Sequence, residues 1–440
     1  MTAGAVAGRR GTTLGVVFLA LFLDCVAFGM LFPLSAELLR FYREHDDGGL
    51  FAAALAWAAG LVPGTSLAQQ EALFGGLVIG VYSLCQFVSA PWWGRLSDRI
   101  GRRPVLLIGL AGTLAANLLW ACTASFTWFI AGRILAGAVN GSVVVANAAV
   151  GDLVEPARRA RAMGLIGMAF GLGFVLGPAL GAITYQPGWL DGVGPFHRFS
   201  VPALAASLLA AINLLWAWRS FAETLPRGVP LPATGRTANP LALFTGGAGA
   251  AIPRINLVFC LYTLLFSGME ATLVFFAFER CGYGVGQVVW VFLAMGLATA
   301  AMQGGVFRPL APRLGVRRMG VAGLALSIPG FALLAMVAGP GQAWALWTGS
   351  VVLACATGLT FPALSTLASL AADPARQGEA MGGFRSAGSL GRALGPYLGA
   401  VAYFGWWPGA PYLIGAVGLV LPLLLVALTV RVAEPPRAPA

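Results

Sequence analysis

Residues 94–104 read Gly-Arg-Leu-Ser-Asp-Arg-Ile-Gly-Arg-Arg-Pro and lie between two long apolar runs. Gly94 and Gly101 suit the tight backbone of a turn, and Pro104 suits the first turn of a helix, where its missing N–H is not needed. Asp98 stands among arginines on both sides. The stretch predicts a short charged loop between two membrane-crossing helices, and a generic loop rich in positive charge is the alternative interpretation.

The composition around this loop requires a bilayer. The chain has 440 residues, of which 58% are hydrophobic and 10% charged, and its mean hydropathy is +0.82. A soluble domain carries about 25% charged residues. The formal charge is +11, and all 27 basic residues are Arg, placed in short clusters between apolar runs. Membrane topology explains these clusters better than a nucleic-acid surface, so we expect a lipid bilayer and no nucleic acid as partner.

The remaining polar chemistry is sparse. The six cysteines show no metal-ligand spacing, and His45 and His197 both lie in polar loops. We therefore expect no metal site and no cofactor. Arg9 and Arg10 precede an apolar run, as in a signal peptide, but the run is too long for one and contains Asp24. We interpret it as an uncleaved first helix.

Twelve apolar stretches reach the length of about 20 residues that a spanning helix needs. The alternating strands of a membrane barrel are absent from the sequence. The chain is therefore predicted to be an all-α membrane protein with two six-helix bundles. The predicted spans are 13–39, 72–93, 104–122, 125–150, 162–185, 200–219, 254–279, 285–307, 319–338, 342–370, 379–404 and 408–430.

Two long connections divide this pattern. We predict an N-terminal bundle over residues 1–219, a cytoplasmic linker over 220–253, and a C-terminal bundle with a short tail over 254–440. The outer loop 41–71 begins polar and turns apolar from Leu50 to Val62, which is short for a span and suits the membrane interface or the outer mouth.

The distribution of Arg sets the orientation. With cytoplasmic termini, Arg40, Arg43, Arg198 and Arg280 fall outside, three Arg fall within spans, and the other 20 fall inside. Positive charge accumulates on the cytoplasmic side, so we expect both termini there. We expect a multi-pass protein of a bacterial inner (plasma) membrane, functional as a monomer.

An internal repeat links the halves. Glu155-Pro-Ala-Arg158 matches Asp373-Pro-Ala-Arg376, and the match continues through 173–182 and 391–400 at a constant offset of 218 residues, as from Pro156 to Pro374. Six spans separate the copies, so both have the same orientation. Such parallel repeats place a substrate site near the bilayer midplane between the halves.

Residues 94–104 resemble the G-x-L-x-D-x-x-G-R-R-P signature of the major facilitator superfamily. Arg133 to Gly137 looks like its R-x-x-x-G motif. Residues 173–181 look like the fifth-helix motif of drug/proton antiporters, G-x-x-x-G-P-x-x-G, whose glycines allow close helix packing. The predicted packing residues are Gly173, Gly177, Pro178 and Gly181, with Gly391, Gly395, Pro396 and Gly399 in the repeat.

A closer likeness covers most of the chain. Asp24 with Gly29 and Pro33 resembles the first helix of bacterial tetracycline/proton antiporters. Residues 266–270, 303–304 and 384–386 resemble tetracycline-transporter-like members of the superfamily, which are associated with organic-anion and drug transport. The resemblance implies a twelve-helix transporter that works by alternating access.

The family's pattern also implies a latch on the cytoplasmic side. Its predicted residues are Gly94, Asp98, Gly101, Arg102, Arg103, Asp152, Arg158 and Arg161. In the second half, residues 308–318 form the equivalent loop, but Pro312 stands where the acid would be. The acidic latch is therefore predicted on one half alone.

Five charges fall inside spans, where ionisable groups are expensive and mark functional sites. Asp24 and Glu270 are candidates for proton coupling, with Arg133 beside them; a structural ion pair, such as Asp24 with Arg133 or Glu270 with an eleventh-span Arg, is the alternative. Arg385 and Arg392 are candidates for binding an anionic substrate group, because a guanidinium offers a planar fork of donors.

Polar residues within other spans complete the candidate substrate site, although interhelical hydrogen bonds explain each of them equally well. They are Tyr82, Gln86, Asn117, Asn140 and Gln303. The favoured function is proton-coupled antiport that exports amphipathic drugs or organic anions. The alternatives are a proton-coupled importer or metabolite facilitator, and a non-transporting receptor or scaffold. An enzyme is disfavoured because we find no nucleophile–base or metal constellation.

Overall fold

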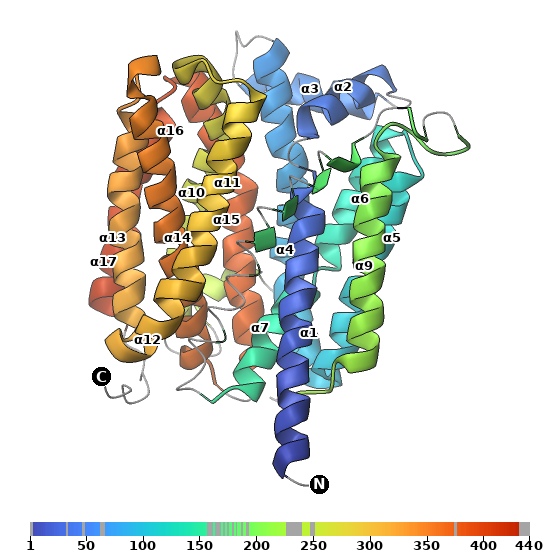
Figure 1. Ribbon diagram of the computed structural model, residues 1–440, viewed down its shortest axis with the longest axis vertical. Helices are drawn as coiled ribbons and strands as arrows, with labels where there is room; N and C mark the ends of the chain where they lie inside the picture. The colour runs from blue at the N-terminus through green and yellow to red at the C-terminus, as the bar shows by residue number, and fades with distance from the viewer. Residues whose placement is uncertain are drawn as a thin grey trace.

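The computed structural model describes residues 3–31, 34–45, 49–61, 67–155, 162, 169, 172–173, 176–177, 180–181, 183–185, 188–190, 193–225, 240–246, 251–373 and 376–430. These residues are mostly helical and contain no strand. The long helices run roughly side by side along one axis, with the N-terminal half on the right and the C-terminal half on the left of Figure 1. This arrangement satisfies the backbone of each segment internally, as lipid requires.

The first half contains eight helices among the described residues. They are α1 (Ala3–Gly29), α2 (Ser35–Glu44), α3 (Leu50–Leu61), α4 (Leu67–Ile100), α5 (Arg102–Ala121), α6 (Phe126–Ala138), α7 (Ser142–Leu153) and α9 (Ser200–Ser220).

The second half begins after a short 3-10 helix, η1 (Pro240–Phe244), in the linker. Its helices are α10 (Ile252–Cys281), α11 (Val285–Ala301), the π-helical turn η2 (Met302–Phe307), α12 (Arg308–Leu314), α13 (Val316–Ala335), η3 (Pro340–Gln342), α14 (Ala343–Ala371), α15 (Gln377–Gly405), α16 (Ala410–Gly418) and α17 (Val420–Thr429).

Eight helical segments are long and apolar enough to cross a bilayer, and all eight coincide with predicted spans. Three further predicted spans, the first, second and eleventh, overlap α1, α4 and α15. The fifth, 162–185, is described at scattered positions alone. The spans therefore follow the predicted order through the described chain.

The predicted first span, 13–39, has the wrong bounds. Helix α1 begins at Ala3 and ends at Gly29, and residues from Ser35 onward form the separate helix α2. The sequence between them contains Pro33, and a proline lacks the N–H that a continuous helix needs. The apolar end of the outer loop forms α3, which lies at the top of Figure 1 beside α2.

The predicted fourth span, 125–150, is interrupted. Helix α6 ends at Ala138 and α7 begins at Ser142, so Val139, Asn140 and Gly141 form a short break inside one membrane-spanning segment. The eighth span is also irregular, because the π-helical turn η2 joins α11 to α12. Such π turns inside α-helices are frequent at functional sites.

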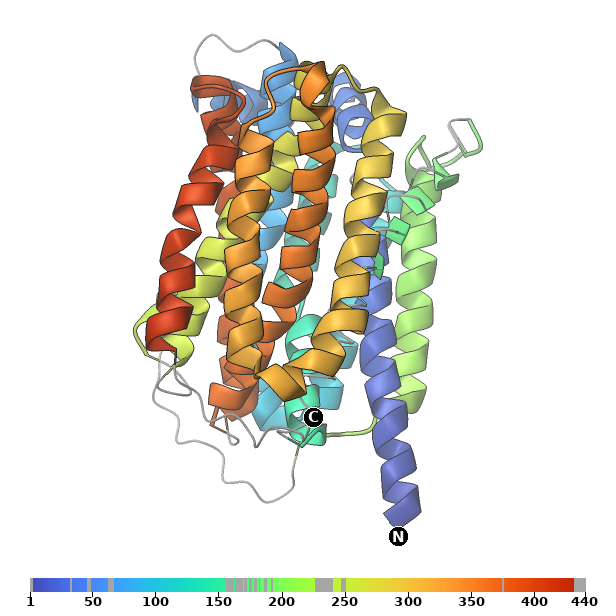
Figure 2. The same cartoon turned by 60° about the vertical axis from the view of Figure 1, so that its left-hand side comes forward.

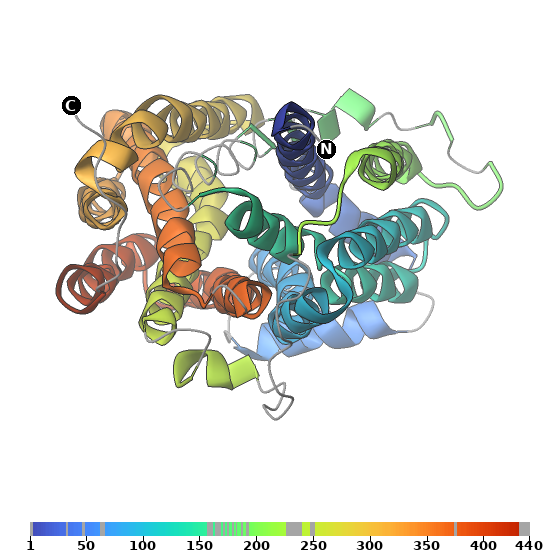
Figure 3. The same ribbon diagram turned by 90° about the horizontal axis from the view of Figure 1, so that it is seen from below.

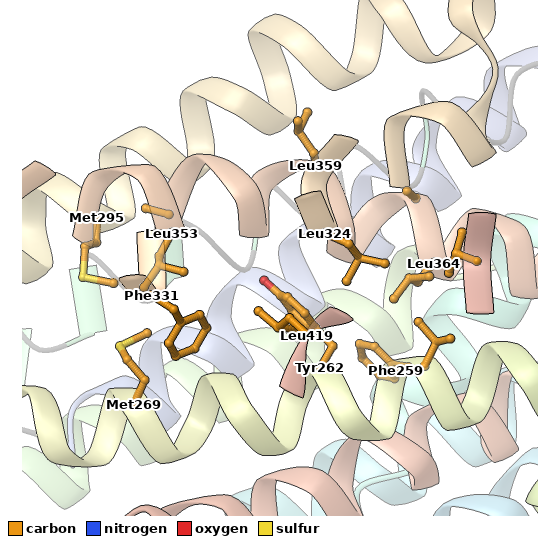
Figure 4. Close-up of a cluster of buried hydrophobic side chains, with 14 of the residues drawn as sticks. Phe259, Tyr262, Met269, Met295, Leu324, Phe331, Leu353, Leu359, Leu364 and Leu419 are labelled. Carbon is orange, nitrogen blue, oxygen red and sulfur yellow. The ribbon is translucent and has the colours of Figure 1, made fainter. Parts of the chain in front are cut away.

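Each half has its own apolar core. The largest cluster of buried side chains draws on the second half, apart from Ala148, and Figure 4 shows part of it around Tyr262, Phe331 and Leu353. Two other large clusters draw on the first half alone. Figures 2 and 3 show the same division, with helices of one half grouped beside those of the other.

Helix α15 joins the halves. It packs extensively against α4 of the first half and α10 of its own half, and it also contacts α7. Small residues allow the approach of α4, because a Cβ on Gly94 would lie 2.3 Å from the carbonyl oxygen of Gly378. The interface between halves therefore runs along one helix that carries Arg385 and Arg392.

Candidate functional site

The end of the bundle that carries residues 94–104 is called the inner end, because the sequence predicts it to be cytoplasmic. Arg102 lies there at the start of α5 with its side chain 1% exposed. Its Nη1 donates to Asp98 Oδ1 at 2.6 Å and to Ser97 Oγ at 2.7 Å, and its Nε donates to Asp152 Oδ2 at 2.8 Å. We call Asp98, Arg102 and Asp152 the inner latch.

The inner latch holds the two halves together. The carboxylate of Asp98 accepts the backbone N–H of Gly378 at 2.9 Å and that of Glu379 at 2.8 Å, both in the first turn of α15. The first N–H groups of a helix have no partner within the helix and favour a negative charge. An acid of the first half therefore caps a helix of the second.

Arg103 and Gly101 lie against Glu223, beside the inner latch. The backbone N–H groups of Arg102 and Arg103 donate to Glu223, which follows α9, and Arg103 Nη2 donates to the Trp218 carbonyl at 2.7 Å. These bonds cap α5 and fasten it to α9 within the first half. Two other residues predicted for the latch, Arg158 and Arg161, lie outside the described residues.

Asp24 lies within α1 and is held by neutral donors. Ser142 Oγ donates to Asp24 Oδ2 at 2.9 Å, and Asn213 Nδ2 donates to Oδ1 at 3.4 Å and to the Ala20 carbonyl at 3.0 Å. Among the described residues Asp24 makes no ion pair, so the alternative of a pair with Arg133 is not found there.

Arg133 lies instead over the ring of Tyr82. Its guanidinium carbon is 4.8 Å from the ring centroid, a cation–π distance. Asn140, in the break between α6 and α7, donates to the Tyr82 hydroxyl. Three residues predicted from two separate spans are thus brought together, and the charge of Asp24 also acts on Tyr82.

The second half presents two arginines and an acid to this group. The charges of Arg385 and Arg392 act on Cys25, next to Asp24, and that of Arg392 also acts on Tyr82 and on Glu270. No ion pair joins Glu270 to Arg392 among the described residues. We call Asp24, Tyr82, Arg133, Glu270, Arg385 and Arg392 the intramembrane cluster.

The other polar residues predicted for the substrate site have different surroundings in the structure. Gln86 accepts a hydrogen bond from Ser389 at 2.5 Å and so joins α4 to α15. Gln303 lies buried in the π-helical turn, where its Oε1 has no hydrogen-bond partner among the described residues. The Nδ2 of Asn117 has no hydrogen-bond partner within the described part of the chain.

The glycine motifs pack as equivalent ridges. A Cβ on Gly177 would lie 2.7 Å from the Cα of Gly29 in α1, and a Cβ on Gly399 would lie 2.7 Å from the Cα of Gly268 in α10. Gly173 also faces α1, Gly181 faces Met30 directly after α1, and Gly391 and Gly395 also face α10. Pro178 lies outside the described residues, and Pro396 faces Gly76 of α4.

The sequence interpretation missed several hydrogen-bond partners of the residues that it identified. Ser142, Asn213 and Glu223 each bind a group that it did identify. One signal was present, because Asn140-Gly141 is a dipeptide typical of turns and stands inside an apolar span. It places the start of a new helix, and hence Ser142, within the membrane.

Two helical halves around buried charges, latched at one end, define a secondary membrane transporter by architecture. The chain matches the family described as the Major Facilitator Superfamily over residues 17–396 and 290–440. It is 35% identical to major facilitator superfamily domain-containing protein 10 of Bos taurus, over 96% of this chain and 92% of that protein. It is 29% identical to the class C tetracycline resistance protein of Escherichia coli, over 93% and 94%.

A comparison with solved structures gives the same result as the sequence comparisons. The crystal structure of the human organic anion transporter MFSD10 (TETRAN) superposes with a TM-score of 0.85 at 32% identity, covering 95% of this chain and 99% of that one. The chain belongs to the major facilitator superfamily. It is therefore a membrane transporter rather than an enzyme, as its sequence predicts.

Proposed function

We propose that the protein exchanges protons for an organic anion or an amphipathic drug by alternating access, and exports the substrate from the inner side. The observation that carries this proposal is the intramembrane cluster, in which the charge of Arg392 acts on Glu270, and those of Arg385 and Arg392 act on Cys25, the neighbour of Asp24 in the sequence. The similarity to an organic anion transporter and to tetracycline resistance proteins supports the substrate class.

The cluster suits a substrate with more than one kind of polar group. Arg385 and Arg392 offer planar donors to a carboxylate or enolate. Asp24 and Glu270 offer acceptors to a cationic or hydroxyl group, and a proton on either acid removes that acceptor charge. Protons and substrate then compete for the same site, which is the requirement for antiport.

A second coupling scheme follows from one electrostatic interaction. Because the charge of Arg392 acts on Glu270, a proton on Glu270 leaves Arg392 more available to an anion. Proton and anion would then bind together and move in the same direction, as in a proton-coupled importer. The direction of proton movement relative to substrate separates the two schemes.

The test is transport in proteoliposomes that contain the purified chain. Internal pyranine reports proton movement, while uptake is measured for fluorescein as an anion and for tetracycline as an amphipathic drug. Antiport predicts proton movement opposite to substrate, and both Asp24→Asn and Glu270→Gln abolish it. Wild-type proton movement in both variants, or substrate flux without protons in the wild type, would refute the coupling.

The anion site is tested in the same vesicles. Arg385→Ala is expected to weaken fluorescein transport and Arg385→Lys to restore part of it, because the charge returns without the fork of donors. Arg308→Ala is the matched control, since Arg308 is exposed and lies outside the intramembrane cluster. Unchanged fluorescein transport in Arg385→Ala would contradict the assignment.

A further inference from the structure

The break in the fourth span is built into the packing. Trp93 Nε1 donates to the Ala138 carbonyl at 2.6 Å, and Ser89 Oγ donates to the Gly137 carbonyl at 3.2 Å, so side chains of α4 satisfy carbonyls at the end of α6. A Cβ on Gly109 of α5 would lie 2.9 Å from the backbone nitrogen of Ser142. Broken helices in membranes persist where protein groups satisfy the freed backbone.

Helix α7 is consequently a separate rod of 12 residues. At its first residue, Ser142 donates to Asp24 of α1. In its last turn, Asp152 accepts from Arg102 of the inner latch and from Thr224 Oγ1 at 3.3 Å. One end of α7 therefore contacts the intramembrane cluster and the other end contacts the inner latch.

We propose that α7 transmits the proton occupancy of Asp24 to the inner latch, and that Ser142 is the positioning residue through which it does so. This inference rests on the proton-coupled function proposed above and names the part of the chain that links proton binding to opening. Helix α7 pivots at Val139–Gly141, where the backbone is not helical.

The physical step is a change in one hydrogen bond and one charge. The ionised Asp24 carboxylate accepts the Ser142 hydroxyl proton in a charge-assisted bond, and it also faces the positive end of the α7 dipole. When a proton from the outer side binds a carboxylate oxygen of Asp24, both attractions weaken. The released α7 then draws Asp152 away from Arg102, and the inner latch loosens.

The surroundings of Asp24 bear on this step. The charge of Asp24 acts on Cys25 of α1 and on Tyr82 of α4. Arg133 of α6 lies over Tyr82, and the charges of Arg385 and Arg392 of α15 act on Cys25. The neutral donors Ser142 and Asn213 come from α7 and α9. Of these elements, α4 and α7 carry residues of the inner latch, Asp98 and Asp152, and α7 is the one that also hydrogen-bonds Asp24.

Helix α15 provides a second connection between the inner latch and the intramembrane cluster. Its first turn binds Asp98 through the N–H groups of Gly378 and Glu379, and the same continuous helix carries Arg385 and Arg392. Figure 1 shows α7 at the lower end of the bundle beside α15 and α1. A shift of α7 at the inner latch therefore reaches the arginines through one rigid helix.

The experiment measures latch opening directly. Spin labels are placed at Ile100→Cys and Leu314→Cys, which are 49% and 44% exposed at the inner ends of the two halves. The full chain, with its native cysteines replaced by Ala and its transport verified, is reconstituted in nanodiscs. In the parent, acidification is expected to lengthen the distance between labels. In Ser142→Ala the distance is expected to be long at both acidic and neutral pH.

Two further variants separate positioning from mere packing. Ser142→Thr keeps the hydroxyl and is expected to restore the pH response. Ser207→Ala, which removes a buried hydroxyl that bonds within α9, is expected to respond like the parent. A parental pH response in Ser142→Ala overturns the inference. A parent that neither moves protons nor responds to pH overturns the proposed function instead.

Discussion

The carboxylate of Asp98, in the first half, accepts the backbone N–H of Gly378, in the second half, at 2.9 Å. The same carboxylate is bound by Arg102, whose other side binds Asp152. The acid is therefore neutralised twice, by a guanidinium of its own half and by a helix N-terminus of the other. Closing the inner end requires this one ionised side chain to satisfy both.

The contact predicts the effect of Asp98→Asn. The amide keeps the size of the side chain but loses the charge, so both the ion pair and the helix cap weaken. We expect the closed inner end to lose about 1–2 kcal/mol, which is about a tenfold change in population. Distances between labels at Ile100→Cys and Leu314→Cys measure it. Glu155→Gln, on an exposed acid at the same end, is the control and is expected to change nothing.

A substitution that changes the size of a residue but not its charge tests the same closure of the inner end. Gly94→Ala would place a methyl group 2.3 Å from the Gly378 carbonyl oxygen, so α4 and α15 have to separate. Overpacking of this kind costs about 1–3 kcal/mol, and we expect slower fluorescein transport with the protein still folded. Gly15→Ala in α1, where an added Cβ meets nothing within 4 Å, is the matched control. Equal transport by both variants would show that transport does not need the close approach of α4 to α15.

These contacts mark how far the sequence could predict the site. Asp98, Arg102 and Asp152 were identifiable because their types and spacing follow a loop pattern. Their partners Gly378 and Glu379 were not, because they act through backbone N–H groups that any residue supplies. Local patterns show which side chains are unusual but not which helix end lies beside them.

Prediction of the fold from the sequence has the same limit. Apolar length located eleven of the predicted spans within the described chain, because the bilayer fixes how long a helix must be. It did not locate the break at Asn140, which depends on Trp93 and Gly109 from other helices. Nor did it place Ser142 against Asp24, since that contact exists only once α7 begins a new helix.

The repeat yields a prediction about stability. Arg317 of the second half donates from Nε to the Val426 carbonyl at 3.2 Å and from Nη2 to the Ala427 carbonyl, as Arg103 does to Trp218 in the first half. Both arginines fasten the third helix of a half to the end of its sixth. Arg317→Ala is expected to destabilise the protein by about 1–2 kcal/mol, and exposed Arg103→Ala by less.

Thermal unfolding of the detergent-purified variants measures this difference. Arg318→Ala is the control, because Arg318 is exposed and has no hydrogen bond among the described residues. A melting temperature for Arg317→Ala equal to that of Arg318→Ala would mean that the carbonyl contacts add no stability. A greater loss for Arg103→Ala than for Arg317→Ala would contradict the expected dependence on burial.

The break in the fourth span gives the last prediction. Trp93→Phe retains an aromatic ring beside Gly141 but removes the N–H that the Ala138 carbonyl accepts at 2.6 Å. A carbonyl left unsatisfied away from water costs about 1–3 kcal/mol. Losing this hydrogen bond therefore destabilises the break and favours a single continuous helix made of α6 and α7. That joining would turn Ser142 away from Asp24 and is expected to reduce proton movement more than substrate binding. Trp92→Phe, on a neighbouring indole that is 49% exposed, is the control, and equal proton movement in the two variants would refute the role of the indole N–H.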